Sequence, residues 1–166
     1  QAVPAIAAHN GPVYMRLLRG QVPLVLDEYG YKFELGKAKL LRDGRDVLII
    51  SSGLMTMRAL EVAKEMADGS ADVAVLHVPT IKPLDEGTIL REANCSGRLV
   101  VVAENHSCVG GLGESVAAVL LRAGIAPEFR QIALPDAFLA AGALPTLHDR
   151  YGLSTASMVA AIKHWI

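Results

Sequence analysis

Two arginines near the start of the chain are the first candidates for binding chemistry. Arg16 lies within, and Arg19 just after, an apolar run that predicts a strand over Val13–Leu18, and Gly20 predicts a turn. Residues three apart face opposite sides of a regular strand, so only one arginine can point into a pocket, and Arg19 is better placed because it borders the turn. Its guanidinium suits bidentate hydrogen bonds to a sugar phosphate. An ion pair across a domain interface is the alternative.

A second candidate is the segment Glu104-Asn105-His106, which follows a strand predicted at Arg98–Ala103. In open α/β sheets, functional groups collect at the carboxyl ends of the strands. His106 can titrate near neutrality and would serve there as a general acid or base. A surface or interface histidine that pairs with Glu104 is the alternative.

The run Gly110-Gly111-Leu112-Gly113 lies between that strand and a helix predicted at Glu114–Ala123. A glycine-rich turn at a helix N-terminus can bind an anion, so a stand-alone anion- or nucleotide-binding regulatory module is one hypothesis. The spacing does not match a dinucleotide fingerprint, because Val116 occupies the position of the third glycine. Close backbone approach for helix–sheet or subunit packing is the alternative.

Several other classes of function find no support in the sequence. It contains neither a nucleotide P-loop nor the Gly-x-Ser-x-Gly elbow of hydrolases. A net charge of -1 without a block of like charge does not favour nucleic acid or a membrane surface as a partner. Cys95 and Cys108 form no disulfide framework and no metal-ligand pattern, which is typical of a reducing cytoplasm. A start at Gln1 rather than at a methionine suggests a fragment or a processed chain.

The elements that must position these residues follow an alternating pattern. The chain has 166 residues, 52% of them apolar and 20% charged, which indicates a globular domain with a sizeable core. Asp85 and Ser154 are predicted helix N-caps. Hydrophobic periodicity predicts strands at Lys37–Arg42, Val47–Ser51, Val73–Val78, Arg98–Ala103 and Phe129–Leu134, and helices at Leu54–Asp68, 85–94, 114–123 and 155–166.

This alternation predicts an α/β three-layer sandwich with a mixed, mostly parallel sheet of about five strands, one of them antiparallel. Asp43-Gly44 predicts a hairpin between the first two strands. Arg98–Ala103 is the most apolar strand and is expected at the centre of the sheet. His77 lies inside an apolar strand and is expected in the core or at a subunit contact. Residues 21–36 read as a connector whose aromatic side chains require a surface to pack on.

Four motifs in this order resemble the C-terminal domain of the transketolase family. Gly11–Pro23 resembles the closing strand of the pyrimidine-binding domain, and Lys82-Pro83-Leu84-Asp85 resembles the family's "K-P-L-D" loop. Glu104–Gly113 is similar to its "E-x-H…G-G-x-G" segment, and Tyr151-Gly152-Leu153 to its closing "Y-G-L". The resemblance covers essentially the whole chain and is closest to the separately encoded C-terminal section of bacterial split transketolases.

The resemblance implies that residues 1–36 are the remnant of a pyrimidine-binding domain with a connector, and that residues 37–166 are the C-terminal domain. It implies an enzyme that uses thiamine diphosphate and Mg²⁺ to transfer two-carbon ketol units between sugar phosphates. This portion would support subunit assembly, would hold no cofactor, metal or catalytic residue, and would be inactive alone. Arg19 would bind the substrate phosphate, and His106 would line the substrate channel.

The resemblance also implies partners: a second copy of the chain, and the N-terminal section that carries the diphosphate-binding domain. Deoxyxylulose-phosphate synthase and the β subunit of 2-oxo-acid dehydrogenases belong to the same superfamily. Their C-terminal domains are the related alternatives.

Overall fold

The strand β2 (Val47–Ser51) is buried on both faces and organises the sheet. The computed structural model describes residues 1–18 and 22–166. In it, β2 lies between β3 (Val73–His77) and β4 (Leu99–Ser107), and it pairs in parallel with both. The outer strands are β1 (Lys39–Arg42) and β5 (Phe129–Leu134), which gives the order β1-β3-β2-β4-β5. β2 is therefore the middle strand of the five, and the segment Arg98–Ala103, which the sequence placed at the centre, forms part of its neighbour β4.

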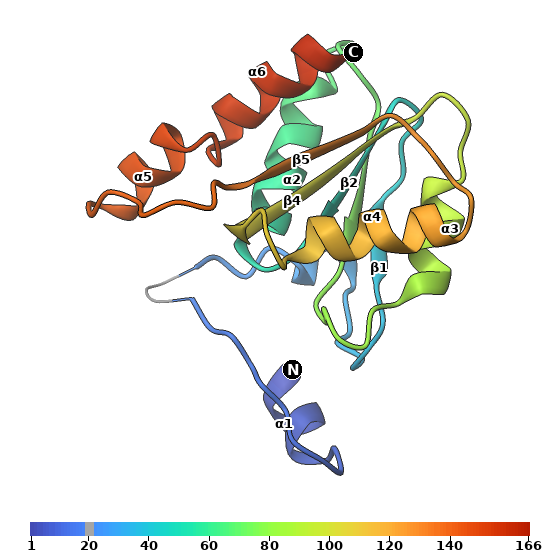
Figure 1. Cartoon of the computed structure of the whole chain (residues 1–166), viewed down its shortest axis with the longest axis vertical. Coiled ribbons are helices and arrows are strands. Elements are labelled where there is room, and N and C mark those ends of the chain that lie inside the picture. The colour runs from blue at the N-terminus through green and yellow to red at the C-terminus, as the bar shows by residue number, and fades with distance from the viewer. Residues whose placement is uncertain (19–21) are drawn as a thin grey trace.

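Two pairs of helices cover the two faces of this sheet (Figure 1). One face carries α2 (Leu54–Met66) and α6 (Thr155–Trp165), and the other carries α3 (Glu86–Ala93) and α4 (Leu112–Arg122). Shorter elements are α1 (Ala2–Ala7), the 3₁₀ turn η1 (Asp27–Tyr29) and α5 (Leu144–Arg150). The prediction of an α/β three-layer sandwich with one antiparallel strand is confirmed.

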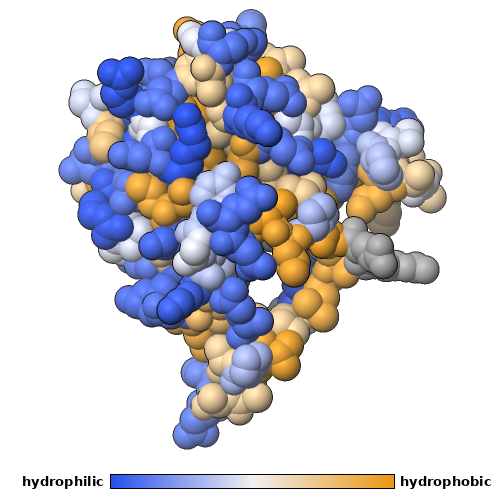
Figure 2. Space-filling view, turned by 180° about the vertical axis from the view of Figure 1, so that it is seen from behind, coloured by the Kyte–Doolittle hydropathy of each residue, from blue (hydrophilic) through white to orange (hydrophobic). Residues whose placement is uncertain are grey.

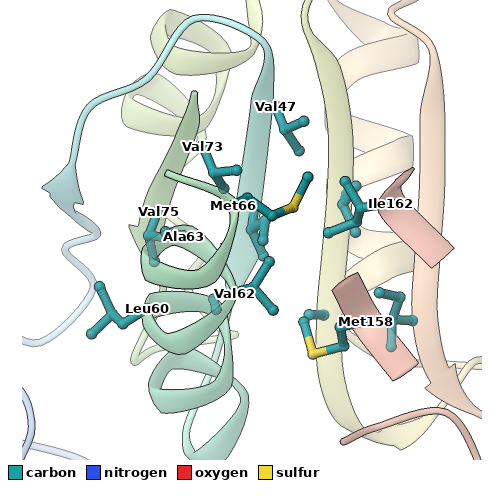
Figure 3. Close-up of a cluster of buried hydrophobic side chains, with 14 of the residues drawn as sticks. Val47, Leu60, Val62, Ala63, Met66, Val73, Val75, Met158 and Ile162 are labelled. Carbon is teal, nitrogen blue, oxygen red and sulfur yellow. The ribbon is translucent and has the colours of Figure 1, made fainter. Parts of the chain in front are cut away.

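Alternate residues of each inner strand supply two separate cores, as the two-residue repeat of a strand requires. Val47 and Ile49 face α2 and α6, whereas Leu48 and Ile50 face α3 and α4. Figure 3 shows the first core, in which Met66 of α2 is directed toward α6. Both predicted N-caps are confirmed: the side chain of Asp85 accepts from the Thr88 amide, and that of Ser154 from the Ser157 amide.

The predicted hairpin at Asp43-Gly44 is wrong. β1 runs antiparallel, as expected, but it pairs with β3, so the loop between β1 and β2 crosses the start of β3. Gly44 is needed for this crossing rather than for a turn with positive φ, since a Cβ on it would stand 2.4 Å from the carbonyl carbon of Val73. The loop is fastened there by Asp46, whose amide donates to the Asp72 carbonyl at 2.9 Å.

The predicted strand Val13–Leu18 is also not a strand in this chain. Residues 12–18 have no regular secondary structure, and with α1 they form an arm that projects from the body (Figure 1). A strand needs a neighbouring strand to satisfy its amides, and no described strand of the chain pairs with this segment. The connector does pack as expected: Val25, Leu26 and Tyr29 contact the core, and Tyr31 is buried.

Within the described residues, the structure contains no helix of the length and hydrophobicity that crossing a bilayer requires.

We expect Gly44→Ala to destabilise the fold by about 1–3 kcal/mol, because the new methyl group would press on the backbone of Val73 and Ala74, which cannot turn aside like a side chain. Urea unfolding monitored by circular dichroism measures the effect. Gly87→Ala is the matched control, since it lies in α3 with open space around its Cβ position and should be neutral or stabilising by up to about 1 kcal/mol. Equal stability of the two variants would contradict the close crossing.

Candidate functional site at the carboxyl edge of the sheet

The four parallel strands end together at one edge of the sheet, where ligand sites of α/β folds lie. Ser51, His77, Ser107 and Leu134 are the last residues of β2, β3, β4 and β5. The side chains that could carry chemistry gather around this edge, as the sequence predicted for Glu104 and His106.

β4 continues past its predicted end at Ala103, and its pairing with β5 is irregular between Ala103 and Ser107. Ala103 pairs with Ile132, and the next pair joins Ser107 to Leu134, so β4 carries two more residues than β5 over this interval. Such a bulge changes the directions of the side chains within it. The result is that Glu104 is buried, Asn105 half-buried and His106 exposed.

Glu104 is a buried carboxylate that fills the N-terminus of α4. Its two oxygens accept hydrogen bonds from the backbone amides of Leu112 at 2.7 Å and Gly113 at 2.8 Å. The side-chain amide of Gln131 on β5 donates to the same carboxylate at 3.1 Å. A charge that is only 3% exposed is tolerated here because charge-assisted hydrogen bonds and the positive end of the helix compensate for its desolvation.

The glycines of the loop make room for this arrangement. A Cβ on Gly111 would stand 2.2 Å from a Glu104 oxygen, and a Cβ on Gly113 would stand 2.3 Å from the Gln131 amide nitrogen. Gly110 has a φ of 74°, the left-handed conformation that glycine adopts readily. The close-approach interpretation of the glycine run is therefore confirmed, and the helix begins at Leu112 rather than Glu114 because Glu104 completes its first turn.

The backbone donors of the loop are already used within the chain. The Cys108 amide donates to the Leu134 carbonyl, the Val109 amide to the Ser107 hydroxyl, and the Gly110 amide to the Glu114 carboxylate. Together with the two amides held by Glu104, these bonds leave no row of free N–H groups for a phosphate. The structure thus argues against the hypothesis of an anion-binding module built on this turn.

His106 is exposed at the tip of the bulge, and no side-chain hydrogen bond holds it within the described residues. It does not pair with Glu104, whose oxygens accept hydrogen bonds from two backbone amides of α4 and from Gln131. Its neighbour in the loop, Val109, is also exposed. The edge therefore presents one imidazole and one apolar side chain outward from a well-bonded loop.

A second cluster of polar side chains at this edge, formed by Ser51, Thr56 and His77, is buried. The Ser51 hydroxyl donates to Thr56 at 3.0 Å, and the Thr56 oxygen lies 2.8 Å from Nδ1 of His77. The ring of Tyr31 packs edge-on against His77, with the ring centroids 5.1 Å apart. Burial lowers the pKa of His77 to about 4, so this histidine is neutral and structural, as the core interpretation expected.

The two predicted arginines are not brought to this edge by described contacts. Arg19 lies outside the described residues. Arg16 is exposed on the arm. Among residues 1–18 and 22–166 there is also no group of three or more histidine, cysteine or acidic side chains that could hold a metal ion.

Exposed apolar side chains flank the edge on two sides. Figure 2 shows hydrophobic surface along the arm, where Tyr14 and Leu17 are 89% and 74% exposed, and Leu24 of the connector is 84% exposed. Between β5 and α5, the loop 135–143 carries Phe138, which is fully exposed, although a Tyr151 hydroxyl holds this loop through the Ala140 amide. Contiguous exposed hydrophobic residues on an ordered segment mark an interaction surface.

Sequence reasoning missed the roles of Glu104, Gln131 and Thr56. The signal for Glu104 was present in the glycines at 111 and 113, which require a bulky neighbour close to the helix start. Gln131 and Thr56 gave no signal, because their partners lie 27 and 21 residues away in the chain.

A family model described as the transketolase C-terminal domain matches residues 36–158. A transketolase family protein of Sinorhizobium fredii is 74% identical over 167 residues, and the match covers 100% of this chain and 48% of that protein. A 6-deoxy-6-sulfo-D-fructose transketolase subunit from a Clostridium species is 42% identical over 160 residues, with 96% and 49% covered. Proteins named 1-deoxy-D-xylulose-5-phosphate synthase also match; that of Heliobacterium modesticaldum is 36% identical over 155 residues, 24% of its length.

Among solved structures, one described as a split gene transketolase in an inactive β4 tetramer superposes with a TM-score of 0.88 at 36% identity. The match covers 98% of this chain and 52% of that one. The chain thus spans about half the length of the two transketolase relatives named above and of this split gene transketolase.

We expect the free energy of unfolding to fall by about 2 kcal/mol between pH 7 and pH 4.5 through His77. The unfolded chain binds this proton near pH 6.5, whereas the folded chain binds it only near pH 4, so the stabilisation is complete above pH 6.5 and is lost on acidification. His148, whose pKa is lowered by burial and by Arg58, adds to the loss in the same direction. Urea unfolding at a series of pH values measures the slope.

The variant His77→Gln is the control for this pH dependence. Its absolute stability will be lower, because the ring contact with Tyr31 is lost, but its stability should change less with pH over the same interval. An unchanged slope in the variant would show that His77 is not held neutral by burial.

Proposed function

The chain belongs to the transketolase family, of which it carries the C-terminal domain, and we propose that it forms the C-terminal portion of a thiamine-diphosphate-dependent enzyme that transfers two-carbon ketol units between sugar phosphates. The observation that carries the proposal is the 42% identity, over nearly the whole chain, to a subunit named as a transketolase. Similarity to a split gene transketolase at 36% identity supports it.

We place thiamine diphosphate and Mg²⁺ in another part of the enzyme. A diphosphate group needs free backbone donors or cations, and the amides at the start of α4 are bonded to Glu104. The residues described here do not fit the cofactor, so this portion would contribute to assembly and to the walls of the site rather than to the cofactor's chemistry.

Residues 1–36 comprise the arm and the connector. The arm is proposed to be a remnant of the preceding, pyrimidine-binding domain. If the segment were extended, Val13, Met15 and Leu17 would occupy one face, and Tyr14 and Leu18 would lie on either side of Arg16 on the other. A strand that is mostly apolar on both faces fits a sheet that helices cover on both sides. The body of this chain offers it no such sheet, which supports an origin in a separate α/β domain.

Two residues are proposed to reach the substrate once the rest of the enzyme covers the carboxyl edge. Arg19 would bind the substrate phosphate through its guanidinium, and His106 would line the channel. The exposure of His106 at the tip of the bulge supports its role. The proposed partners are a second copy of the chain and the section that carries the diphosphate-binding domain, in a cytoplasmic enzyme.

A related reaction, the synthesis of 1-deoxy-D-xylulose 5-phosphate, is the second candidate because such synthases reach 36% identity with this chain. The identity favours the first candidate: the transketolase subunit from the Clostridium species is 42% identical to this chain and the synthase 36%. Assays with an aldose phosphate acceptor and with pyruvate as donor distinguish the two reactions. No observation favours the 2-oxo-acid dehydrogenase alternative.

We expect no saturable heat when the 166-residue chain is titrated with thiamine diphosphate and Mg²⁺ in a calorimeter, and no ketol transfer from a ketose phosphate to an aldose phosphate by this chain alone. The reason is that its helix N-terminus is occupied by Glu104 and it has no metal cluster in the described residues. Addition of the diphosphate-binding section should restore both binding and turnover. Saturable binding by the chain alone would overturn this assignment of the cofactor.

We expect the amides of residues 11–18 to exchange hydrogen rapidly in the isolated chain and to become protected in the assembled enzyme, where the arm gains strand partners. Hydrogen exchange followed by mass spectrometry measures both states. Peptides from β2 are the internal control, because they are buried and bonded on both sides in either state. Equal, rapid exchange of the arm in the assembly would contradict the missing-strand proposal.

A further inference from the structure

We propose that residues 135–150, the strap, form a pH-responsive device: the strap docks on the body through the buried side chain of His148 and is released when this imidazole takes up a proton. The strap begins directly after β5 and ends with α5. It carries the fully exposed Phe138, so its release would loosen an apolar surface at the carboxyl edge of the sheet. The device is independent of the proposed function.

The strap is attached to the body mainly through His148. Residues 135–146 are all exposed, and neither hydrophobic core includes a residue of the strap. Leu147 is half-buried, but its side chain lies next to Gly142, which belongs to the strap itself. His148 is the one buried side chain of α5 and is 4% exposed. Figure 1 shows α5 at the margin of the molecule, near the start of α6.

The other side-chain bonds of the strap are exposed and are made to residues that follow it closely in the chain. The Ala140 amide donates to the Tyr151 hydroxyl at 3.0 Å, and the Ser154 hydroxyl donates to Asp149 at 2.9 Å. Such bonds contribute little net stability, because water can replace either partner. Undocking of His148 would therefore leave the strap only weakly attached.

The surroundings of His148 accept a neutral imidazole and disfavour a charged one. Its Nε2 is buried and has no hydrogen-bond partner within the described chain. The charged side chains of α2 in this region are Arg58 and Glu61. Nη1 of Arg58 donates to Glu61 and to Thr155, both at 3.2 Å, and the Thr155 hydroxyl also donates to Glu61. The Glu61 carboxylate is thus engaged elsewhere.

Neither α5 nor α6 supplies a counter-charge for this imidazole. On α5, Asp149 is bonded to Ser154, and the guanidinium of Arg150 lies over the ring of Tyr151. The first turn of α6 contains no acidic residue. A proton on His148 would therefore place a positive charge in a buried position without a paired anion, which is costly.

The sign of the pH dependence follows from the two states of His148. Burial, and secondly the charge of Arg58, lower the pKa of the docked imidazole. The released imidazole is in water and binds a proton near pH 6.5. Docking is therefore fully favoured above about pH 6.5 and weakens as the pH falls, because protonation favours the released state. The released population rises about tenfold for each pH unit below 6.5, until the pKa of the docked imidazole is reached.

Hydrogen exchange of single amides, followed by NMR in the 166-residue chain, tests the proposal. The reporters are the amides of Leu147 and Tyr151, which donate to the carbonyls of Ala143 and Leu147. After correction for the intrinsic pH dependence of exchange, we expect their protection factors to fall by up to about tenfold between pH 7.5 and pH 5.5.

The variant His148→Gln removes the titrating group and keeps a polar side chain. Its reporter amides should show protection that no longer changes over this pH range. His164→Gln is the matched control, because it removes an exposed histidine of α6 and should keep the full response. Protection that is independent of pH in the unaltered chain, or an equal response in His148→Gln, would overturn the proposal.

A titration of the His148 ring protons by NMR uses the unaltered chain and so covers a failure of His148→Gln to fold. We expect His148 to titrate below pH 6.5. In Arg58→Met, which removes the neighbouring positive charge, the midpoint should rise and the loss of reporter protection on acidification should become smaller. Titration of His148 at or above pH 6.5 in the unaltered chain would refute the device.

Discussion

The structure depends on the complete burial of β2 between two layers of helices. All five of its residues are shielded from solvent, so its amides must pair on both sides and its side chains must be covered on both faces. The parallel strands β3 and β4 satisfy the first requirement, and the helix pairs α2/α6 and α3/α4 satisfy the second. β1 is left to the outer edge, where its lysine and arginine remain in contact with water, and four carboxyl ends come to lie along one line.

Glu104 shows how a charge can be placed in such an interior. A carboxylate at this depth is costly unless every oxygen has a partner, and here two backbone amides and Gln131 provide them. The positive end of α4 is consumed in the process. The start of α4 is therefore not free to bind a ligand, and the side chains that this loop exposes are those of His106 and Val109.

Local signals in the sequence were sufficient to predict the layers of helices and sheet, but they did not show which strands pair with each other. Asp85 and Ser154 mark their helices through interactions within four residues, and the apolar alternation of β2 defines two faces. The hairpin prediction at Asp43-Gly44 was wrong because the same dipeptide suits both a tight turn and a close crossing of another strand. The position of β3, which is remote in sequence, decides between the two. The edge that holds His106 could be predicted because the residue directly follows a strand of a mostly parallel sheet. The bonds of Glu104 could not, since they depend on a two-residue bulge against β5.

The arm explains why this edge needs a covering partner. Transfer of each large apolar side chain from water to an interior contributes about 1.5–3 kcal/mol, and Tyr14 and Leu17 of the arm, with Leu24 of the connector, are largely exposed to water. The described body does not supply that burial: β1 and β5 form the two edges of its sheet, and no described strand pairs with the arm at either edge. Phe138, in the loop between β5 and α5, is likewise an apolar side chain left exposed to water. Because apolar side chains flank the exposed imidazole of His106, the proposed partner that buries the arm would also cover His106 and exclude water from it.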